Sequence, residues 1–200
     1  MLKLYHAPRS RSSRFVWLLE ELGADYQLHY TNIERGDGSG GEDPDNPHPD
    51  KKVPALMHDG ELVTESGAVA LYLTDLFPEA ALGPKAGDRT RGDYLTWLFY
   101  YSGVVEPVIA IEFSGLGDNP ALFRTFRGRA ELDRRLLDHL KHGPYLLGET
   151  FSAADVLFAS MGMFSRQMLP TGKLMDDYLA RCTSRPALKA ALAKDAPPKR

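Results

Sequence analysis

In the first fifty residues, two short strand patterns flank one amphipathic helix pattern. Residues 2–5 are largely apolar and residues 25–33 alternate between apolar and polar side chains, so both stretches predict β-strands. Between them, apolar residues from Phe15 to Leu22 recur at the spacing of one helix face. A strand, a helix and a strand in this order predict a parallel pair with a right-handed crossover. Residues 34–52 are rich in Gly, Pro and acidic side chains, and predict a surface loop.

A β-hairpin and a further helix are predicted next. Residues 53–65 hold two apolar runs around Asp59 and Gly60, a pair typical of a two-residue hairpin turn. From Ser66 the apolar residues again recur at helical spacing, until Pro78 ends the pattern. The first part of the chain therefore predicts a small mixed sheet of order βαβ-ββα, with helices packed on its faces.

The second part of the chain shows helical patterns only. The segments that favour helix by spacing and residue type are residues 89–115, 120–141, 152–167, 173–182 and 187–194. We expect an α/β domain over residues 1–82, a linker over residues 83–88 and an all-α domain over residues 89–200. At the start of the third of these helices, Ser152 and Asp155 have the spacing of a capping box, which predicts a structural role.

Composition excludes several classes of function. The 24 basic and 27 acidic residues leave a net charge of −3, which gives no electrostatic reason to expect nucleic acid or an anionic membrane as partner. We see neither a signal peptide nor a continuous apolar run of about 18 residues, and expect a cytoplasmic protein without a membrane span. Cys182 is the single cysteine, so no internal disulfide or Cys-x-x-Cys pair can form, and we expect no metal site.

Two helix starts carry candidate chemistry. The segment HAPRSRSSRF, at the first junction of strand and helix, places Ser10, Ser12 and Ser13 where a hydroxyl can either cap the helix or meet an anion. At the next helix start, Glu65 suits an ammonium group, while Ser66 and the free N–H groups suit a carboxylate. The α-groups of an amino acid would fit there. The alternative for Ser66 is that it only caps the helix.

Several motifs in one order resemble the cytosolic glutathione transferase family. VPAL is followed by ESGAVALYL, behind a βαβ unit and ahead of an all-helical half. The stretches SRSSRFVWLLEELGADYQL, NPHPDKKVPAL and FSAADVLFA resemble further segments of bacterial and fungal members. The resemblance spans nearly the whole chain and implies a thioredoxin-like N-terminal domain, the glutathione transferase fold and transferase activity.

The resemblance also implies a glutathione site. In this site the peptide bond before Pro54 is cis. The alternative is an ordinary trans proline, which is more frequent, since only about 5–6% of X-Pro bonds in folded proteins are cis. The backbone of Val53 pairs with the cysteinyl part of glutathione, and Lys52 reaches the glycine carboxylate. Glu65 and Ser66 hold the γ-glutamyl end, in agreement with the reading of these two residues from their chemistry.

Three residues compete to contact the glutathione thiol. In serine-type members the activating serine lies about four positions before an arginine in the first helical turn, and Ser10 stands in this relation to Arg14. Ser12 is the second choice, because motif registers vary between classes. Arg11 is the third, since it occupies roughly the position of the cysteine in cysteine-type members. Cys182 lies far along the chain, so cysteine-type chemistry is not expected.

The resemblance also implies an electrophile site, the ligands and the assembly. Family members place the wall of the electrophile site on the first helix after the linker, where Tyr100 and Tyr101 are our candidates. The expected ligands are glutathione as co-substrate and a small hydrophobic electrophile, with no further cofactor, and the expected assembly is a homodimer. A glutathione-dependent peroxidase using the same site and a non-catalytic interaction module are the alternatives.

Overall fold

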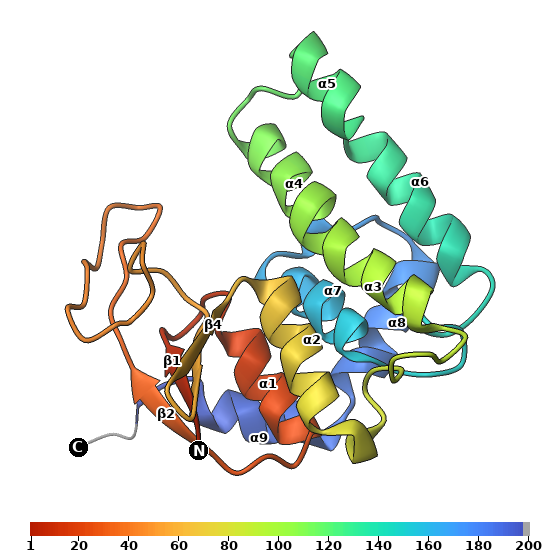
Figure 1. Cartoon of the computed structure of the whole chain (residues 1–200). Coiled ribbons are helices and arrows are strands. Elements are labelled where there is room, and N and C mark those ends of the chain that lie inside the picture. Colours follow the sequence, from red (N-terminus) through yellow and green to blue (C-terminus); the bar gives the residue numbers. More distant parts are fainter. Residues whose placement is uncertain (198–200) are drawn as a thin grey trace. The chain divides into compact units, whose positions relative to one another are not determined.

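The computed structural model describes residues 1–197 and divides the chain into two compact units (Figure 1). The first unit comprises Met1–Leu82 together with the chain from Arg185 onward, and the second comprises Gly83–Ser184. Each unit encloses buried apolar side chains of its own.

A four-stranded mixed sheet forms the centre of the first unit. Its strands, in the order β2-β1-β3-β4, are β1 (Leu2–His6), β2 (Tyr26–Tyr30), β3 (Ala55–His58) and β4 (Glu61–Thr64). β1 pairs with β2 in parallel, whereas β3 is antiparallel to both β1 and β4, which confirms the predicted parallel pair and hairpin. The hairpin turn at Asp59 and Gly60 has φ angles of 49° and 95°, the positive values that a two-residue turn of this kind requires.

Three α-helices complete the first unit: α1 (Ser13–Glu21), α2 (Ser66–Leu76) and α9 (Pro186–Lys194), with a short 3-10 turn, η1 (Pro78–Ala80). α1 contacts β1, α2 and α9 (Figure 1). Because it has neighbours on several sides, α1 buries consecutive residues from Arg14 to Leu19 and not only one stripe.

We expected the all-α domain to continue to residue 200; residues 198–200 lie outside the described part of the chain. The chain from Arg185 onward packs with the first unit, where Leu188 and Ala191 are buried. The Arg185 guanidinium donates two hydrogen bonds of 2.7 Å to the carboxylate of Glu21 in α1. The period of a helix shows which face is apolar but not which distant helix covers it, so the sequence could not assign α9 to its unit.

All named elements in the described part of the second unit are helices. Its elements are α3 (Arg91–Tyr100), a π-helical turn η2 (Tyr101–Val105), α4 (Glu106–Phe113), α5 (Pro120–Phe126), α6 (Arg129–Leu140), α7 (Ala153–Phe164), a 3-10 turn η3 (Arg166–Met168) and α8 (Lys173–Thr183). The single helix predicted over residues 120–141 is two helices, because Arg127 adopts a left-handed φ of 68° before Gly128 and interrupts the hydrogen-bond ladder. The other predicted helices lie close to their expected positions.

One continuous helix in this unit is long and apolar. Arg91–Phe113 spans 23 residues with a mean hydropathy of 1.2 in its most apolar window, so length and composition alone would allow it to cross a membrane. The helix contains Thr96, Ser102 and Glu106, so it is not a continuous apolar run. The core helix of a soluble protein passes the same test, and Tyr94 and Trp97 of this helix lie in the core of the second unit.

Asp155 is the main polar group in the core of the second unit. It forms the predicted capping box with Ser152 at the start of α7. The Ser152 N–H and O–H donate to its Oδ2 at 2.8 and 2.9 Å, while the Leu146 N–H and the Tyr178 O–H donate to its Oδ1 at 2.9 and 3.1 Å. Burial raises the pKa of Asp155 to about 6, although the four hydrogen bonds oppose this shift. Asp155 thus ties together α7, α8 and the loop before α7.

Replacing Asp155 with alanine is expected to lower the free energy of unfolding by about 3 kcal/mol or more, because several buried donors lose their acceptor. A lone helix cap would cost about 0.5–2 kcal/mol. Chemical denaturation measures the difference, with the exposed Asp118→Ala as a control that removes the same charge from the same unit. Unchanged stability combined with lost activity would reassign Asp155 to the chemistry.

Candidate functional site

The sheet register brings three loops together at one end of the first unit. Tyr5 near the end of β1 pairs with Ala55 at the start of β3, and Ala55 pairs with Thr64 at the end of β4. The loop after β1, the segment before β3 and the start of α2 therefore begin from one row of the sheet. These segments carry all of the residues that we predicted to contact glutathione.

The loop after β1 holds Ser10 and Ser12 in one hydrogen-bond network. The two hydroxyl oxygens lie 2.8 Å apart, and the Ser10 hydroxyl donates to the carbonyl oxygen of Ala7 at 2.7 Å. Ser12 is fully buried, and its oxygen accepts the Ala7 N–H at 3.1 Å. Ser10 is only half-buried, so of these two hydroxyls it is the one that the solvent side can reach.

His6 decides where the Ser12 proton lies. Its Nε2 lies 3.0 Å from the carbonyl oxygen of Asp195, which can only accept, so Nε2 carries the proton. Burial lowers the pKa of His6, which keeps the ring neutral and leaves Nδ1 as an acceptor. Ser12 therefore donates to Nδ1 across 2.9 Å. Because Ser12 is fully buried whereas Ser10 is only half-buried, Ser12 is the weaker candidate to stabilise a ligand thiolate.

The segment before β3 presents Lys52 and Val53. The Val53–Pro54 peptide bond is cis, as the resemblance implied. Lys52 is exposed, and its carbonyl oxygen accepts a hydrogen bond of 3.0 Å from Asn46. The neighbouring Lys51 instead donates to the carbonyl oxygens of Pro44 and Asn46 at 3.2 and 2.8 Å. Lys51 therefore holds the loop together, while the charge of Lys52 points to solvent.

The start of α2 offers an open helix terminus. Glu65 occupies the position before the helix, and its side chain makes no capping hydrogen bond there. Ser66 is buried at the first helical position. The first N–H groups of a helix lack carbonyl partners within it, so this terminus suits a carboxylate, and the exposed Glu65 suits an ammonium group.

Left-handed backbone marks all three segments. Arg9, Lys51 and Glu65 have φ angles of 53°, 52° and 66°, which non-glycine residues rarely adopt. Each of them directly precedes a predicted ligand residue: Ser10, Lys52 or Ser66. Strained backbone of this kind concentrates at functional sites. Three independent loops thus share one local feature at the same end of the sheet.

The remaining predicted residues lie in different surroundings. Arg11 is exposed in the loop after β1. Tyr100 in the second unit is half-buried, and the Arg135 guanidinium lies 3.9 Å from its ring centre. Tyr101 is fully buried, and its ring packs edge-on against Phe158 with centroids 5.1 Å apart. Tyr101 belongs to the core of the second unit, so only Tyr100 remains as a wall for an electrophile.

Sequence reasoning missed three residues that hold the loop after β1. They are His6, Arg35, which donates to the Pro8 carbonyl oxygen at 3.0 Å, and Asp195, whose carboxylate accepts the Arg9 N–H at 3.1 Å. A histidine at the end of an apolar strand was the available signal for His6. Asp195 gave none, because it lies 186 residues from its partner Arg9.

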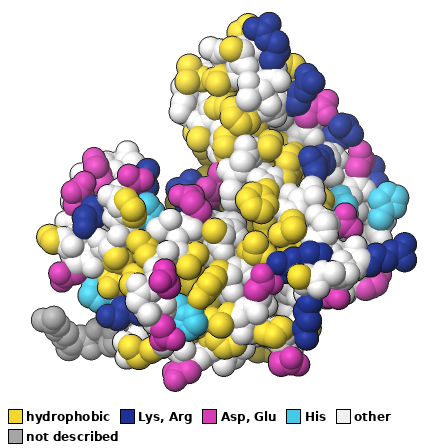
Figure 2. Space-filling model, in the orientation of Figure 1, with side chains coloured by type: hydrophobic (Ala, Val, Ile, Leu, Met, Phe, Trp, Pro, Cys, Tyr) yellow, Lys and Arg dark blue, Asp and Glu magenta, His cyan; other side chains and the backbone are white. Residues whose placement is uncertain are grey.

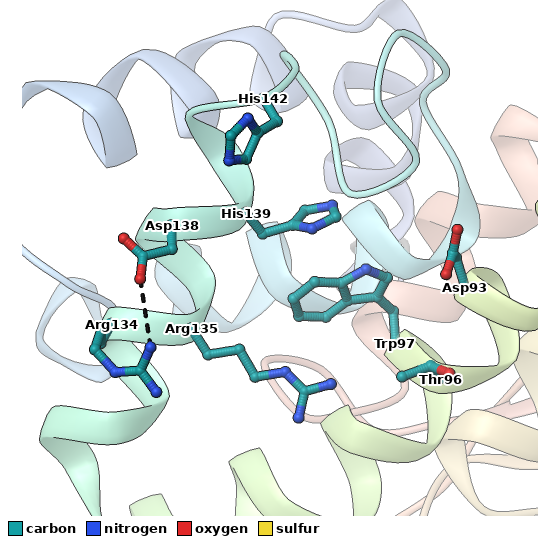
Figure 3. A pocket seen from close by; sticks show the side chains of 8 residues that line it. All are labelled: Asp93, Thr96, Trp97, Arg134, Arg135, Asp138, His139 and His142. Carbon is teal, nitrogen blue, oxygen red and sulfur yellow. Dashed lines mark hydrogen bonds and ion pairs between the residues drawn. The ribbon is translucent and has the colours of Figure 1, made fainter.

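The second unit contains a separate groove of about 370 Å³ between α3 and α6 (Figure 3). Its lining residues are Asp93, Thr96, Trp97, Arg134, Arg135, Asp138, His139 and His142. Arg134 pairs with Glu131 and Asp138, and the His139 ring packs against Trp97 with centroids 4.7 Å apart. None of the residues that line this groove was predicted to contact glutathione.

No cluster of three His, Cys, Asp or Glu side chains in residues 1–197 could hold a metal ion. Cys182 is buried in α8.

Comparison with known proteins identifies glutathione transferases as similar proteins. A model of the glutathione S-transferase N-terminal domain matches residues 1–75. Glutathione S-transferase GstA of Escherichia coli O157:H7 is 28% identical over 158 residues, which cover 77% of this chain and 77% of the relative. A glutathione transferase structure from Methylococcus capsulatus has a TM-score of 0.75 at 29% identity and covers 98% of both chains. A sphingomonad glutathione S-transferase in complex with glutathione has a TM-score of 0.77 at 25% identity, covering 96% of this chain and 98% of that chain.

The matched N-terminal domain contains the sheet, the cis peptide bond and the start of α2, and the structural likeness extends over both units. The chain has the glutathione transferase fold, and the matched domain and these relatives support its membership of the cytosolic glutathione S-transferase family.

Proposed function

We propose that this protein is a glutathione transferase that binds glutathione at the end of the sheet in the first unit and activates its thiol with Ser10. The register row Tyr5–Ala55–Thr64 carries the proposal, because it gathers the serine loop, Val53 and the start of α2 within one site. The names of the relatives support transferase activity, and the sphingomonad complex supports glutathione as the ligand.

Each part of glutathione has a chemical counterpart in this arrangement. Lys52 supplies a positive charge for the glycine carboxylate, and the Val53 backbone pairs with the cysteinyl amide. Ser66 and the N–H groups at the start of α2 receive the γ-glutamyl carboxylate, while Glu65 receives its ammonium group. The thiol then lies toward Ser10, with Ser12 and Arg11 as the alternatives.

Hydrogen bonding to the thiolate supplies the required energy. A free thiol has a pKa near 8.5, and lowering it by two units corresponds to about 2.7 kcal/mol. A hydrogen bond to a charged acceptor supplies about 1.5–3 kcal/mol, and the start of α1 adds about 0.3–1 kcal/mol. No general base is required, because the thiol proton is lost to water before the thiolate attacks the electrophile.

The electrophile in this proposal is small and hydrophobic. Tyr100 offers an aromatic surface, and hydrophobic side chains gather over α4 and α5 on the face seen in Figure 2. The exposed Phe113, Leu116 and Phe123 belong to this part of the second unit. Family membership further supports a cytoplasmic homodimer, which sedimentation of the purified protein tests.

A combined binding and turnover assay tests the activity. The protein is expected to be retained on immobilised glutathione and to conjugate a generic aryl halide. Retention without turnover of aryl halides or peroxides would favour an interaction module, whereas turnover of peroxides alone would favour a glutathione peroxidase. Failure of retention would contradict the whole proposal.

Ser10→Ala is expected to return the pKa of the bound glutathione thiol to about 8.5, because the hydroxyl donor is lost. Titration of the thiolate absorbance in the complex measures this value. Ser12→Ala is expected to keep most of the shift, since Ser12 is fully buried. The exposed Ser39→Ala is the control. If the thiol pKa in Ser10→Ala stayed as low as in the wild type, Ser12 or Arg11 would be favoured instead.

Lys52→Ala is expected to raise the KM for glutathione by about tenfold with little change in kcat, because an ion pair made in ground and transition states alike is lost. With glutathione esterified at its glycine carboxylate, wild type and variant are expected to become alike. Lys189→Ala, an exposed lysine on α9, controls for the lost charge. An equal KM effect with the ester would refute the assigned contact.

A further inference from the structure

The C-terminal end of α9 lies against the loop that carries Ser10. One carboxylate oxygen of Asp195 accepts the Arg9 N–H at 3.1 Å, and the other lies 3.6 Å from His6 Nε2. The backbone carbonyl oxygen of Asp195 accepts the proton of His6 Nε2 at 3.0 Å. A single residue at the end of α9 therefore contacts both the strand before the loop and the residue next to Ser10.

These contacts fix the two conformational features on which the position of Ser10 depends. Arg9 has a left-handed φ of 53°, which its bond to Asp195 helps to hold, although a side chain disfavours it. His6 binds the Ser12 proton, and Ser12 in turn lies 2.8 Å from the Ser10 oxygen. The Asp195 side chain thus acts on Ser10 through Arg9, whereas its backbone carbonyl oxygen holds His6 and keeps that contact when the side chain is replaced.

Other contacts hold Asp195 itself in place. The Tyr30 hydroxyl donates to the carbonyl oxygens of Lys194 and Ala196 at 2.9 and 3.2 Å, on either side of Asp195. Lys194 pairs with Glu20 at 2.5 Å. The end of α9 is therefore held by groups from β2 and α1.

We propose that Asp195 is a positioning residue for thiol activation, whose carboxylate holds the Ser10 loop through the Arg9 N–H and makes the C-terminal end of α9 part of the glutathione site. This inference rests on the proposed function. It assigns to α9 a task within the reaction in addition to its packing on α1. Asp195 itself makes no contact with glutathione in this scheme.

Losing the charge of Asp195 and losing the position of Ser10 would shift the pKa of the glutathione thiol in opposite directions, which allows a clear test. Removing a nearby carboxylate would by its charge alone lower the pKa of the glutathione thiol, because the thiolate would lose a repulsive neighbour. Losing the position of Ser10 would raise that pKa. A rise in the thiol pKa therefore reports lost positioning, and loss of stability alone would produce neither shift.

The experiment compares Asp195→Ala, Asp195→Asn and Asp25→Ala with the wild type. Asp195→Ala is expected to raise the pKa of bound glutathione by half a unit or more and to lower kcat by about tenfold, because small misplacements of a reacting group cost up to about 100-fold. KM for glutathione is expected to change little, since Lys52, Glu65 and Ser66 are untouched. Asp195→Asn keeps an oxygen acceptor for the Arg9 N–H and is expected to recover most of the activity.

The control and a ligand-free measurement complete the test. Asp25→Ala removes an exposed carboxylate from the same unit and is expected to behave as the wild type. Amide hydrogen exchange of Arg9 in the free protein is expected to be faster in Asp195→Ala than in the wild type and Asp25→Ala.

Two results would overturn the inference, and they are distinguishable. If the wild type lowers the thiol pKa and Asp195→Ala does so equally with unchanged kcat, the positioning role is wrong and the proposed function stands. If the wild type itself neither binds glutathione nor lowers its thiol pKa, the proposed function and the inference fall together.

Discussion

A buried, neutral histidine connects the parts of the first unit that matter for chemistry. His6 ends β1, accepts the Ser12 proton at the start of α1 and donates to the last turn of α9. An imidazole can do both only in one tautomer, and burial keeps it from acquiring a second proton. The position of the loop between β1 and α1 therefore depends on a contact that local sequence does not supply.

The sheet provides the second constraint. Because β3 is antiparallel to both of its neighbours, the end of β1, the start of β3 and the end of β4 meet in one row. Displacing β3 by one residue would turn its alternating side chains to the opposite face and move Val53 away from the serine loop. The same pairing that buries Leu4 and Leu56 thus also assembles the predicted glutathione contacts.

Local patterns predicted local structure well. The parallel pair, the hairpin at Asp59 and Gly60 and the capping box of Ser152 and Asp155 each depend on neighbouring residues, and all three are confirmed. The place of α9 and the roles of His6 and Asp195 depend on contacts between residues nearly 190 positions apart, which no periodicity encodes. Motifs could suggest Ser10 and Ser12, but their sequence could not show that Ser12 is fully buried while Ser10 is only half-buried.

Backbone strain explains why a distant helix belongs to the site. Arg9 and Lys51 adopt left-handed conformations that glycine would adopt freely, and each is held by a contact from elsewhere: Asp195 binds the Arg9 N–H, and the Lys51 ammonium binds Pro44 and Asn46. In both places the strained residue precedes a predicted ligand residue. Without glycine, the chain needs these outside contacts to fix the local geometry. The last helix therefore contributes to the geometry of a site whose predicted ligand contacts all come from the first 66 residues.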